Sequence, residues 1–342
     1  MPNRGQILRV LPYALLLLLA LVPQVYPAAQ VLLTLALAKS LAVLGVIVLL
    51  QAGQVSFGHA LFFAIAAYAA AFLGNSMGGG EIVVSLVLGM VCSAAVALVV
   101  GVFIVRYRHI FFGMLNLALS MIFFSFLEKF YYVTGGSDGL SVARPRVLGM
   151  ALERGPFELV LFYGTLGLVI GALVLTHRFL SSPLGQMMRA IKTNEVRLEY
   201  LGVSARNVLL AGYVLSAALC GLGGVLMSTA QGIVTPEYAW WVRSGEFVFI
   251  AILGGAGSVG GAVVGTLTYE AVKTYAAAFA ADIWQMILGA VLLVIILYAP
   301  NGLIGLFRSW TRRAAGPDAT ERETETQIPA SRRTGDRVGA GE

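Results

Sequence analysis

Long apolar runs separated by short polar segments recur along most of the chain. Each is close to the length that a helix needs to cross the ~30 Å hydrocarbon core of a bilayer. No run shows the strict alternation of a barrel strand, so the pattern predicts an all-α integral membrane protein. The predicted spans, about ten in number, are 10–29, 31–50, 57–73, 82–104, 109–130, 157–177, 207–230, 240–255, 258–279 and 282–300.

The two ends of the chain differ from the apolar part. Residues 1–9 are predicted to be a cytoplasmic N-terminus, followed by a transmembrane domain over 10–307. Arg4 and Arg9 precede the first apolar run, which is long enough to be a retained span rather than a cleaved signal. Residues 308–342 mix seven Arg and six acidic residues with small polar ones, which predicts a disordered cytoplasmic tail.

The positions of Lys and Arg indicate the orientation. With the N-terminus inside, most of the 23 basic residues fall on the cytoplasmic side. An even number of spans then places the C-terminus inside as well. Two longer loops follow from this arrangement, an external loop at 131–156 and a cytoplasmic loop at 178–206.

Composition excludes several classes of protein. Hydrophobic residues make up 58% of the chain and charged residues only 12%, against about 25% charged in ordinary globular chains. Mean hydropathy is +0.85. These values exclude a soluble enzyme, an ordinary nucleic-acid binder and a disordered protein. Cys92 and Cys220 lie inside apolar runs, where small core residues are expected rather than a disulfide scaffold.

The sequence contains no recognisable catalytic or metal-binding pattern. None of the four lysines follows a glycine, so the phosphate-binding loop of ATPases is absent. The three histidines are scattered, and no Cys cluster or Gly-x-Ser-x-Gly elbow occurs. We therefore predict no catalytic residue, no metal site and no cofactor on this chain. If ATP drives its activity, another chain must bind it.

The cytoplasmic loop contains an amphipathic pattern. Ser182 and Pro183 are typical of a helix start, and Asn194 can cap a second short helix that ends at Gly202. The apolar positions of the first helix share one face: Leu184, Met187, Met188 and Ile191. Two interpretations remain open, a loop lying at the lipid interface and an exposed surface for docking a partner.

This loop also carries a resemblance. The run from Gly185 to Gly202 resembles the coupling loop of ABC importer permeases, most closely the LivM-type branched-chain amino acid permease family. The similarity covers roughly residues 30–310. It departs from the usual pattern at Gln186, Arg197 and Leu198. Other stretches resemble family motifs in family order: Gly53-Gln54-Val-Ser56-Phe57-Gly58-His59, Thr134–Leu140, Gly254–Gly261 and Pro300–Leu303.

The resemblance implies a type II ABC importer permease fold in a bacterial inner membrane. It implies association with two ATP-binding subunits, a second and different permease subunit, and a periplasmic or extracellular solute-binding protein. ATP and Mg would be bound on the partner subunits. The solute would be a branched-chain amino acid or a related small amphipathic molecule, and no nucleic acid is expected.

The resemblance also assigns roles to residues. The residues expected to couple to an ATPase subunit are Gly185, Arg189, Ala190, Ile191, Asn194, Glu195, Leu201 and Gly202. The residues expected to line the pathway or form its gate are Gln54, Ser56, Phe57, Gly58, His59, Gly254, Gly255, Gly257 and Ser258. Docking of a binding protein falls on Gly135, Gly136 and Asp138.

Residue chemistry leaves alternatives for two of these groups. The segment around Gly58 can be a tight cytoplasmic turn or a broken helix lining the pathway, and His59 can be an interior residue with satisfied hydrogen bonds. Gly257, Gly261 and Gly265 fall four apart, which favours a close-packing stripe over a pore lining.

A different class of transporter is also compatible with the sequence. Charged residues in or near the last spans could serve an ion-coupled secondary transporter, with Glu246, Glu270 or Asp282 as the coupling carboxylate. A requirement for ATP hydrolysis by co-purifying subunits would separate the two alternatives.

Overall fold

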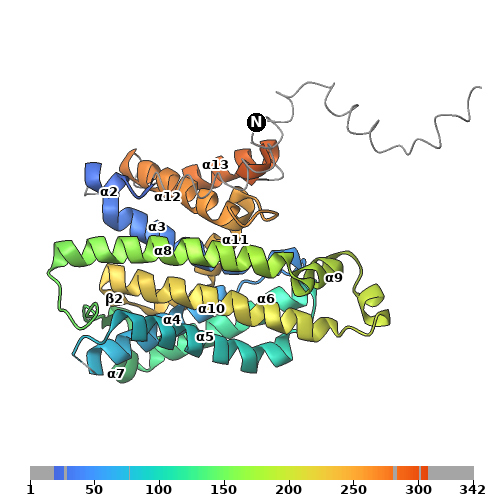
Figure 1. The fold of residues 1–342 in the computed structure, drawn as a ribbon, viewed down its shortest axis with the longest axis horizontal. Helices are drawn as coiled ribbons and strands as arrows, with labels where there is room; N and C mark the ends of the chain where they lie inside the picture. The colour runs from blue at the N-terminus through green and yellow to red at the C-terminus, as the bar shows by residue number, and fades with distance from the viewer. Residues whose placement is uncertain (1–18, 27–28, 77, 280–282, 300–301, 307–342) are drawn as a thin grey trace, which may run out of the picture.

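The computed structural model describes residues 19–26, 29–76, 78–279, 283–299 and 302–306 (Figure 1). Six of its helices are long and apolar enough to cross a membrane. They are α3 (Ala29–Gln51), α4 (His59–Ser76), α5 (Ile82–Ile104), α6 (His109–Lys129), α8 (Arg154–Ser181) and α10 (Ala205–Gln231). These helices coincide with six of the predicted spans.

The remaining described elements are shorter or less apolar. They are α2 (Val22–Val25), α7 (Tyr131–Thr134), η1 (Gly136–Asp138), β1 (Leu140–Ser141), α9 (Pro183–Tyr200), β2 (Ile233–Val234), η2 (Pro236–Ala239), α11 (Trp241–Gly254), α12 (Gly261–Phe279) and α13 (Trp284–Tyr298). Helices α11, α12 and α13 occupy the last three predicted spans. Most of the predicted first span and the predicted tail lie outside the described residues, so the total of ten spans stays a prediction.

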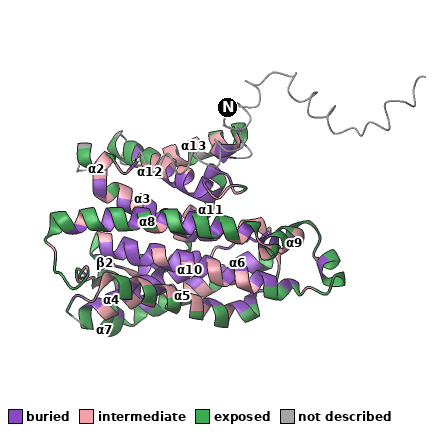
Figure 2. Cartoon of the chain, viewed as in Figure 1, coloured by how far each residue is buried: buried purple, intermediate pink, exposed green. Residues whose placement is uncertain are grey.

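Helices α3 and α10 form the centre of the bundle. In its most apolar window α3 is 78% buried, whereas α5 is 22% buried, and Figure 2 shows the same contrast between purple and green helices. Small residues let the two central helices approach closely. A Cβ atom on Gly45 would lie 2.5 Å from the Ser216 carbonyl oxygen, and one on Gly223 would lie 2.5 Å from that of Ala38.

The peripheral helices expose apolar side chains. On α5 and α6 the side chains of Val99, Ile110 and Phe111 are among the most exposed in the described part of the chain. Such a surface is costly in water and favourable against lipid tails. Of the two cysteines, Cys220 is buried and Cys92 half-buried, and both are free thiols, as the sequence predicts.

Contacts between loops divide them between two ends of the bundle. At one end, β1 pairs with β2 in antiparallel register, Leu140 opposite Val234, and Asn75 donates to the Ser141 carbonyl over 2.9 Å. At the other end, α9 lies beside the turns that join α3 to α4 and α5 to α6 (Figure 1). This division agrees with the alternation of sides that the apolar runs predict. Which end faces the cytoplasm stays a prediction.

The last three helices form a layer beside α3. Helices α11 and α12 contact α3 as well as each other, and α12 contacts α13 (Figure 1). The run 31–50, which carries a lysine in its middle, is therefore packed on both sides: against α10 on one side and this layer on the other.

Candidate functional site

Helix α9 begins and bends where its sequence predicts. The Ser182 hydroxyl accepts a hydrogen bond from the Gly185 amide over 3.5 Å, which caps the first turn. At Asn194 the backbone leaves helical geometry (φ −162°, ψ 100°), and its side-chain oxygen accepts from the Arg197 amide over 3.1 Å. Gly202 has φ 79°. The predicted pair of short helices is confirmed as one kinked element.

The apolar face of α9 is turned toward the bundle. Met188 and Ile191 are buried, and a Cβ atom on Gly212 of α10 would lie 2.5 Å from the Met188 methyl carbon. The sequence-based alternative that this stripe is an exposed docking surface is therefore wrong. The stripe fastens α9 to its own spans, and the opposite, polar face is the one left open to a partner.

The predicted coupling residues separate into two groups. Gly185 and Ile191 are buried and cannot contact a partner directly. A Cβ atom on Gly185 would lie 2.4 Å from Leu180 Cα, so this glycine is required by packing. The remaining members are exposed or half-buried: Arg189, Ala190, Asn194, Glu195, Leu201 and Gly202.

Two of the accessible predicted coupling residues, Arg189 and Glu195, make hydrogen bonds to other residues of the chain. The Arg189 guanidinium donates to the Leu180 carbonyl oxygen over 2.9 Å. Glu195 receives two hydrogen bonds from Arg108, over 2.9 Å from Nε and 2.6 Å from Nη2. No local pattern in the sequence pairs Arg108 with a residue 87 positions away.

Arg108 joins α9 to the start of α6. Besides Glu195, its guanidinium donates to the carbonyl oxygens of Val105 and Tyr107 in the α5–α6 turn. The next residue, His109, begins α6 with φ 55° and donates its amide to Gln54 Oε1 over 2.8 Å. A continuous series of polar contacts therefore runs from α9 to the segment between α3 and α4.

That segment, residues 52–58, is non-helical and packed. Gln54, Ser56 and His59 are all at most 2% exposed. His59 Nε2 bonds to the Ser216 hydroxyl, which in turn donates to the Gly45 carbonyl oxygen over 2.8 Å. These contacts bear out the interior position of His59, which joins α4 to α10 and α3, but the expectation that all of its hydrogen bonds are satisfied is not met. Its Nδ1 has no partner among the described residues.

Other residues of the Gly53–His59 motif are also held by close packing. A Cβ atom on Gly58 would lie 2.6 Å from the Asn116 carbonyl oxygen of α6, and Phe57 lies near Gly113 of the same helix. The Ser56 hydroxyl accepts from the Gly58 amide over 3.3 Å. The turn interpretation therefore describes the local geometry, and a role in the pathway stays a prediction.

The glycine motif Gly254–Gly261 packs the end of α11 against the start of α12. A Cβ atom on Gly261 would lie 2.6 Å from the Gly255 carbonyl oxygen, and one on Gly265 would lie 2.5 Å from that of Ile250. The close-packing interpretation is confirmed for these two glycines. It is wrong for Gly257, where a Cβ would meet nothing within 4 Å. Gln51 of α3 donates to the Ala256 carbonyl oxygen over 2.7 Å, so Gly254, Gly255 and Ser258 lie at the same end as α9.

Three charged residues meet between α3 and the α11–α12 layer. Lys39 Nζ lies 2.6 Å from Glu246 Oε1 and also contacts Glu270 Oε1, and the side chains are 3%, 15% and 13% exposed respectively. Lys39 Nζ also lies 5.3 Å from the centre of the Tyr269 ring. Both glutamates were singled out from the sequence without their partner, although a lysine in the middle of an apolar run requires one. Asp282 lies outside the described residues.

At the opposite end, the predicted docking residues form a tight turn. Gly135 and Gly136 have φ 74° and 50°, conformations that favour glycine. Asp138 is exposed and accepts from the Tyr131 hydroxyl over 2.8 Å. This bond, together with the negative charge of Asp138, raises the pKa of Tyr131. Gly136 is buried, so of the three residues Asp138 is the one most open to a partner.

Metal chemistry finds no support in the described part of the chain. Among these residues no group of three or more His, Cys, Asp or Glu side chains is arranged to hold an ion.

Comparison with known proteins gives a consistent result. The family model described as branched-chain amino acid transport system / permease component matches residues 29–297. The permease protein LivM of Salmonella typhimurium is 26% identical over 289 residues, covering 77% of this chain and 67% of the relative. LivM of Escherichia coli is 26% identical over 277 residues, covering 75% and 65%.

A relative from a third organism is also similar. The probable permease LivM of Methanocaldococcus jannaschii is 27% identical over 239 residues, covering 64% of this chain and 68% of the relative. The matched region thus spans about two thirds of the length of these relatives. No solved structure matches. On the match over 29–297, the chain belongs to the family of permease components of branched-chain amino acid transport systems.

Proposed function

We propose that this chain is a permease subunit of an ATP-driven importer, forming part of the pathway for a branched-chain amino acid or a related small amphipathic solute. Family membership supports the permease role, and LivM and LivH permeases both occur among its relatives. In this proposal the chain performs no covalent chemistry. Its fold resembles that of type II importers, with about ten spans and both termini in the cytoplasm of a bacterial cell.

The proposed partners follow from the same assignment. Two ATP-binding subunits carry ATP and Mg and dock on the cytoplasmic end. A second, different permease subunit lies beside this one in the inner membrane, and a periplasmic or extracellular solute-binding protein docks on the turn that contains Asp138. The glycine motifs near His59 and Gly257 contribute to the pathway or its gate.

The observation that carries the proposal is the attachment of α9. Its apolar face is buried on α10, its polar face is open, and Glu195 ties it to the start of α6 through Arg108. A helix fastened in this way moves with the spans, because displacing it alone would expose Met188 and break the ion pair. Such an element can convert the closure of a docked ATPase into movement of helices.

ATP-dependent uptake by the purified complex tests this function. Proteoliposomes loaded with ATP and supplied with the binding protein should accumulate leucine, and loading with a non-hydrolysable analogue should abolish accumulation. Arg189→Glu, on the open face of α9, should remove uptake and solute-stimulated ATP hydrolysis. The matched control is Arg146→Glu, an exposed arginine at the opposite end, which should retain both.

The same preparation tests the secondary-transporter alternative. Uptake that proceeds without nucleotide and collapses on addition of an ionophore would refute the ATP-driven proposal. Unchanged coupling in Arg189→Glu would refute the role of the open face of α9.

A further inference from the structure

The first residue of α6 has an unusual backbone conformation. His109 has φ 55°, and in the described part of the chain Leu148 is the only other non-glycine residue with a positive φ. This left-handed region is disfavoured for residues with a Cβ atom, because Cβ comes too close to the following carbonyl oxygen. Such residues persist where their surroundings impose the conformation, often at elements that switch between two states.

A hydrogen bond to a buried side chain depends on this conformation. The His109 amide donates to Gln54 Oε1 over 2.8 Å. Gln54 is 2% exposed, so its side-chain oxygen has little access to water. Removing the donor from a buried acceptor costs free energy. The bond therefore fixes Gln54 on the start of α6.

The segment that carries Gln54 is packed between two other elements. In this segment, residues 52–58, a Cβ atom on Gly53 would lie 3.0 Å from Lys192 Cγ of α9. On the other side, a Cβ atom on Gly113 of α6 would lie 3.0 Å from the Val55 carbonyl oxygen. The backbone of the segment thus lies against α9 and against α6, so a shift between these two helices must act on it.

The residue before His109 ties the same point to α9. The Arg108 guanidinium donates to both carboxylate oxygens of Glu195, over 2.9 Å and 2.6 Å. Displacement of α9 therefore pulls on the peptide group that joins Arg108 to His109. That peptide group contains the amide bonded to Gln54. Rotating it breaks this bond and lets His109 adopt the right-handed geometry that α6 otherwise has.

We propose that Gln54 and His109 form a latch, closed in this structure, which movement of α9 opens. The closed latch fixes residues 52–58 on α6. When a docked ATPase displaces α9, the His109 amide leaves Gln54, and the segment moves together with α4, which begins at His59. The inference deepens the proposed function and rests on it for the source of the movement. Gln54 and His109 are positioning residues in this scheme.

Two substitutions at His109 should act in opposite directions. Glycine adopts positive φ readily, so His109→Gly keeps the amide and should favour the closed latch by about tenfold, the cost of left-handed geometry to other residues. Proline lacks the N–H and has φ near about −65°, so His109→Pro excludes the closed latch. Proline is otherwise suited to the first residue of a helix. His109→Ala keeps both the amide and the cost and serves as the reference.

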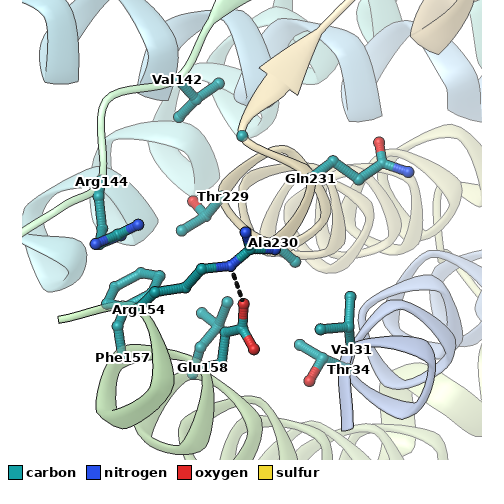
Figure 3. A pocket seen from close by; sticks show the side chains of 12 residues that line it. Val31, Thr34, Val142, Arg144, Arg154, Phe157, Glu158, Thr229, Ala230 and Gln231 are labelled. Carbon is teal, nitrogen blue, oxygen red and sulfur yellow. Dashed lines mark hydrogen bonds and ion pairs between the residues drawn. The ribbon is translucent and has the colours of Figure 1, made fainter. Parts of the chain in front are cut away.

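The start of α8 offers a matched control for the proline variant. Arg154 is the first residue of α8 and does not have a positive φ. It lies at the opposite end of the bundle, at a cavity of about 330 Å³, where its side chain pairs with Glu158 over 2.8 Å (Figure 3). Arg154→Pro therefore puts proline at the same helix position without a latch, and residues 52–58 should be unaffected.

Hydrogen exchange of the purified complex in nanodiscs, followed by mass spectrometry, measures the latch. Without nucleotide, peptides covering residues 52–58 should exchange at least about tenfold faster in His109→Pro than in His109→Ala, and about tenfold slower in His109→Gly. Gln54→Leu, which removes the acceptor, should also accelerate exchange. A non-hydrolysable ATP analogue should accelerate exchange in the unmodified complex, and less so in His109→Gly. Basal ATP hydrolysis should rise in His109→Pro and lose its stimulation by solute.

Several results would overturn the latch. These are equal exchange in the glycine and proline variants, an equally large effect of Arg154→Pro, or no response of residues 52–58 to the ATP analogue. If His109→Pro does not assemble, equal exchange in His109→Gly and His109→Ala is sufficient to reject it.

ATP-driven uptake by the unmodified complex, measured in parallel, separates the latch from the proposed function. Normal uptake together with any of the contrary results would leave the function standing and reject the latch. Opposite shifts in the glycine and proline variants without ATP-driven uptake would support the contact between Gln54 and His109 and refute the function.

Discussion

The ion pairs of Lys39 allow a quantitative test of how the α11–α12 layer is held to the central helices. The perturbation is Lys39→Met, which keeps the length of the side chain and removes its charge. Glu246 and Glu270 then remain together at 15% and 13% exposure with no cation at Lys39. Two carboxylates left in such a site repel each other and lose their nearest compensating charge, while Arg243 and Lys273 still act electrostatically on Glu246.

The magnitude follows from the burial of the triad. Removing one partner of a buried ion pair costs about 3–5 kcal/mol, because an uncompensated charge stays in a low dielectric. Both glutamates share one lysine here, so the cost is that of one deletion and not the sum of two independent pairs. Replacing all three groups by neutral ones, in Lys39→Met/Glu246→Gln/Glu270→Gln, should restore most of the loss, since neutral replacements of buried ion pairs are often close to neutral in stability.

The assay is denaturation of the purified protein in detergent micelles, followed by tryptophan fluorescence and gel filtration. Lys39→Met should unfold at distinctly lower denaturant than the unmodified chain, and the triple variant should lie close to it. Glu128→Gln, an exposed glutamate on α6, is the control and should change stability by less than ~0.5 kcal/mol. Equal stability of Lys39→Met and the unmodified chain would refute the structural role. A triple variant as unstable as Lys39→Met would refute the electrostatic explanation.

Three further predictions concern the end that carries α9. Arg108→Glu should lower ATP-driven uptake about tenfold, because the bidentate ion pair with Glu195 is lost. The exchange Arg108→Glu/Glu195→Arg should recover much of the uptake. Equal uptake in the single and the exchanged variants would contradict the proposal that this ion pair links α9 to α6. Gly261→Leu should reduce the amount of folded protein in membranes, because its Cβ would lie 2.6 Å from the Gly255 carbonyl oxygen. Gly257→Ala should be tolerated, since its Cβ would meet nothing within 4 Å. Immunoblots of membrane fractions measure both amounts, and equal amounts of the two variants would contradict the packing role of Gly261. Ser182→Ala should lower stability by about 1 kcal/mol, the typical value of an N-cap, measured by the same denaturation assay, and no change would show that the cap is not required.

Local features of the fold could be predicted from the sequence. Each of the six long apolar helices corresponds to an apolar run, because the length of such a run reflects the thickness of the bilayer core. The caps at Ser182 and Asn194 were equally predictable, since capping depends on side chains two or three residues from the amides that they bind. The order of motifs also indicated the family.

The candidate site was only partly predictable. The sequence groups the predicted coupling residues of α9 as a set, but it does not show which face of the helix is open to a partner. The sequence shows an apolar stripe without showing whether lipid, a partner or the chain itself covers it. In the folded chain α10 covers it, and this decides that the polar face is the available one.

The amino-acid sequence alone was thus enough to predict the apolar helices, their caps and the family of this protein. Tertiary structure decided which residues of distant segments meet: Lys39 with glutamates 207 and 231 positions away, Arg108 with Glu195, and Gly261 with the end of α11. The physical reason lies in the helices themselves. A membrane helix that is apolar on all sides, as α3 nearly is, carries no polarity that indicates its rotation. Only packing of small residues and pairing of rare charges determine which face meets which neighbour.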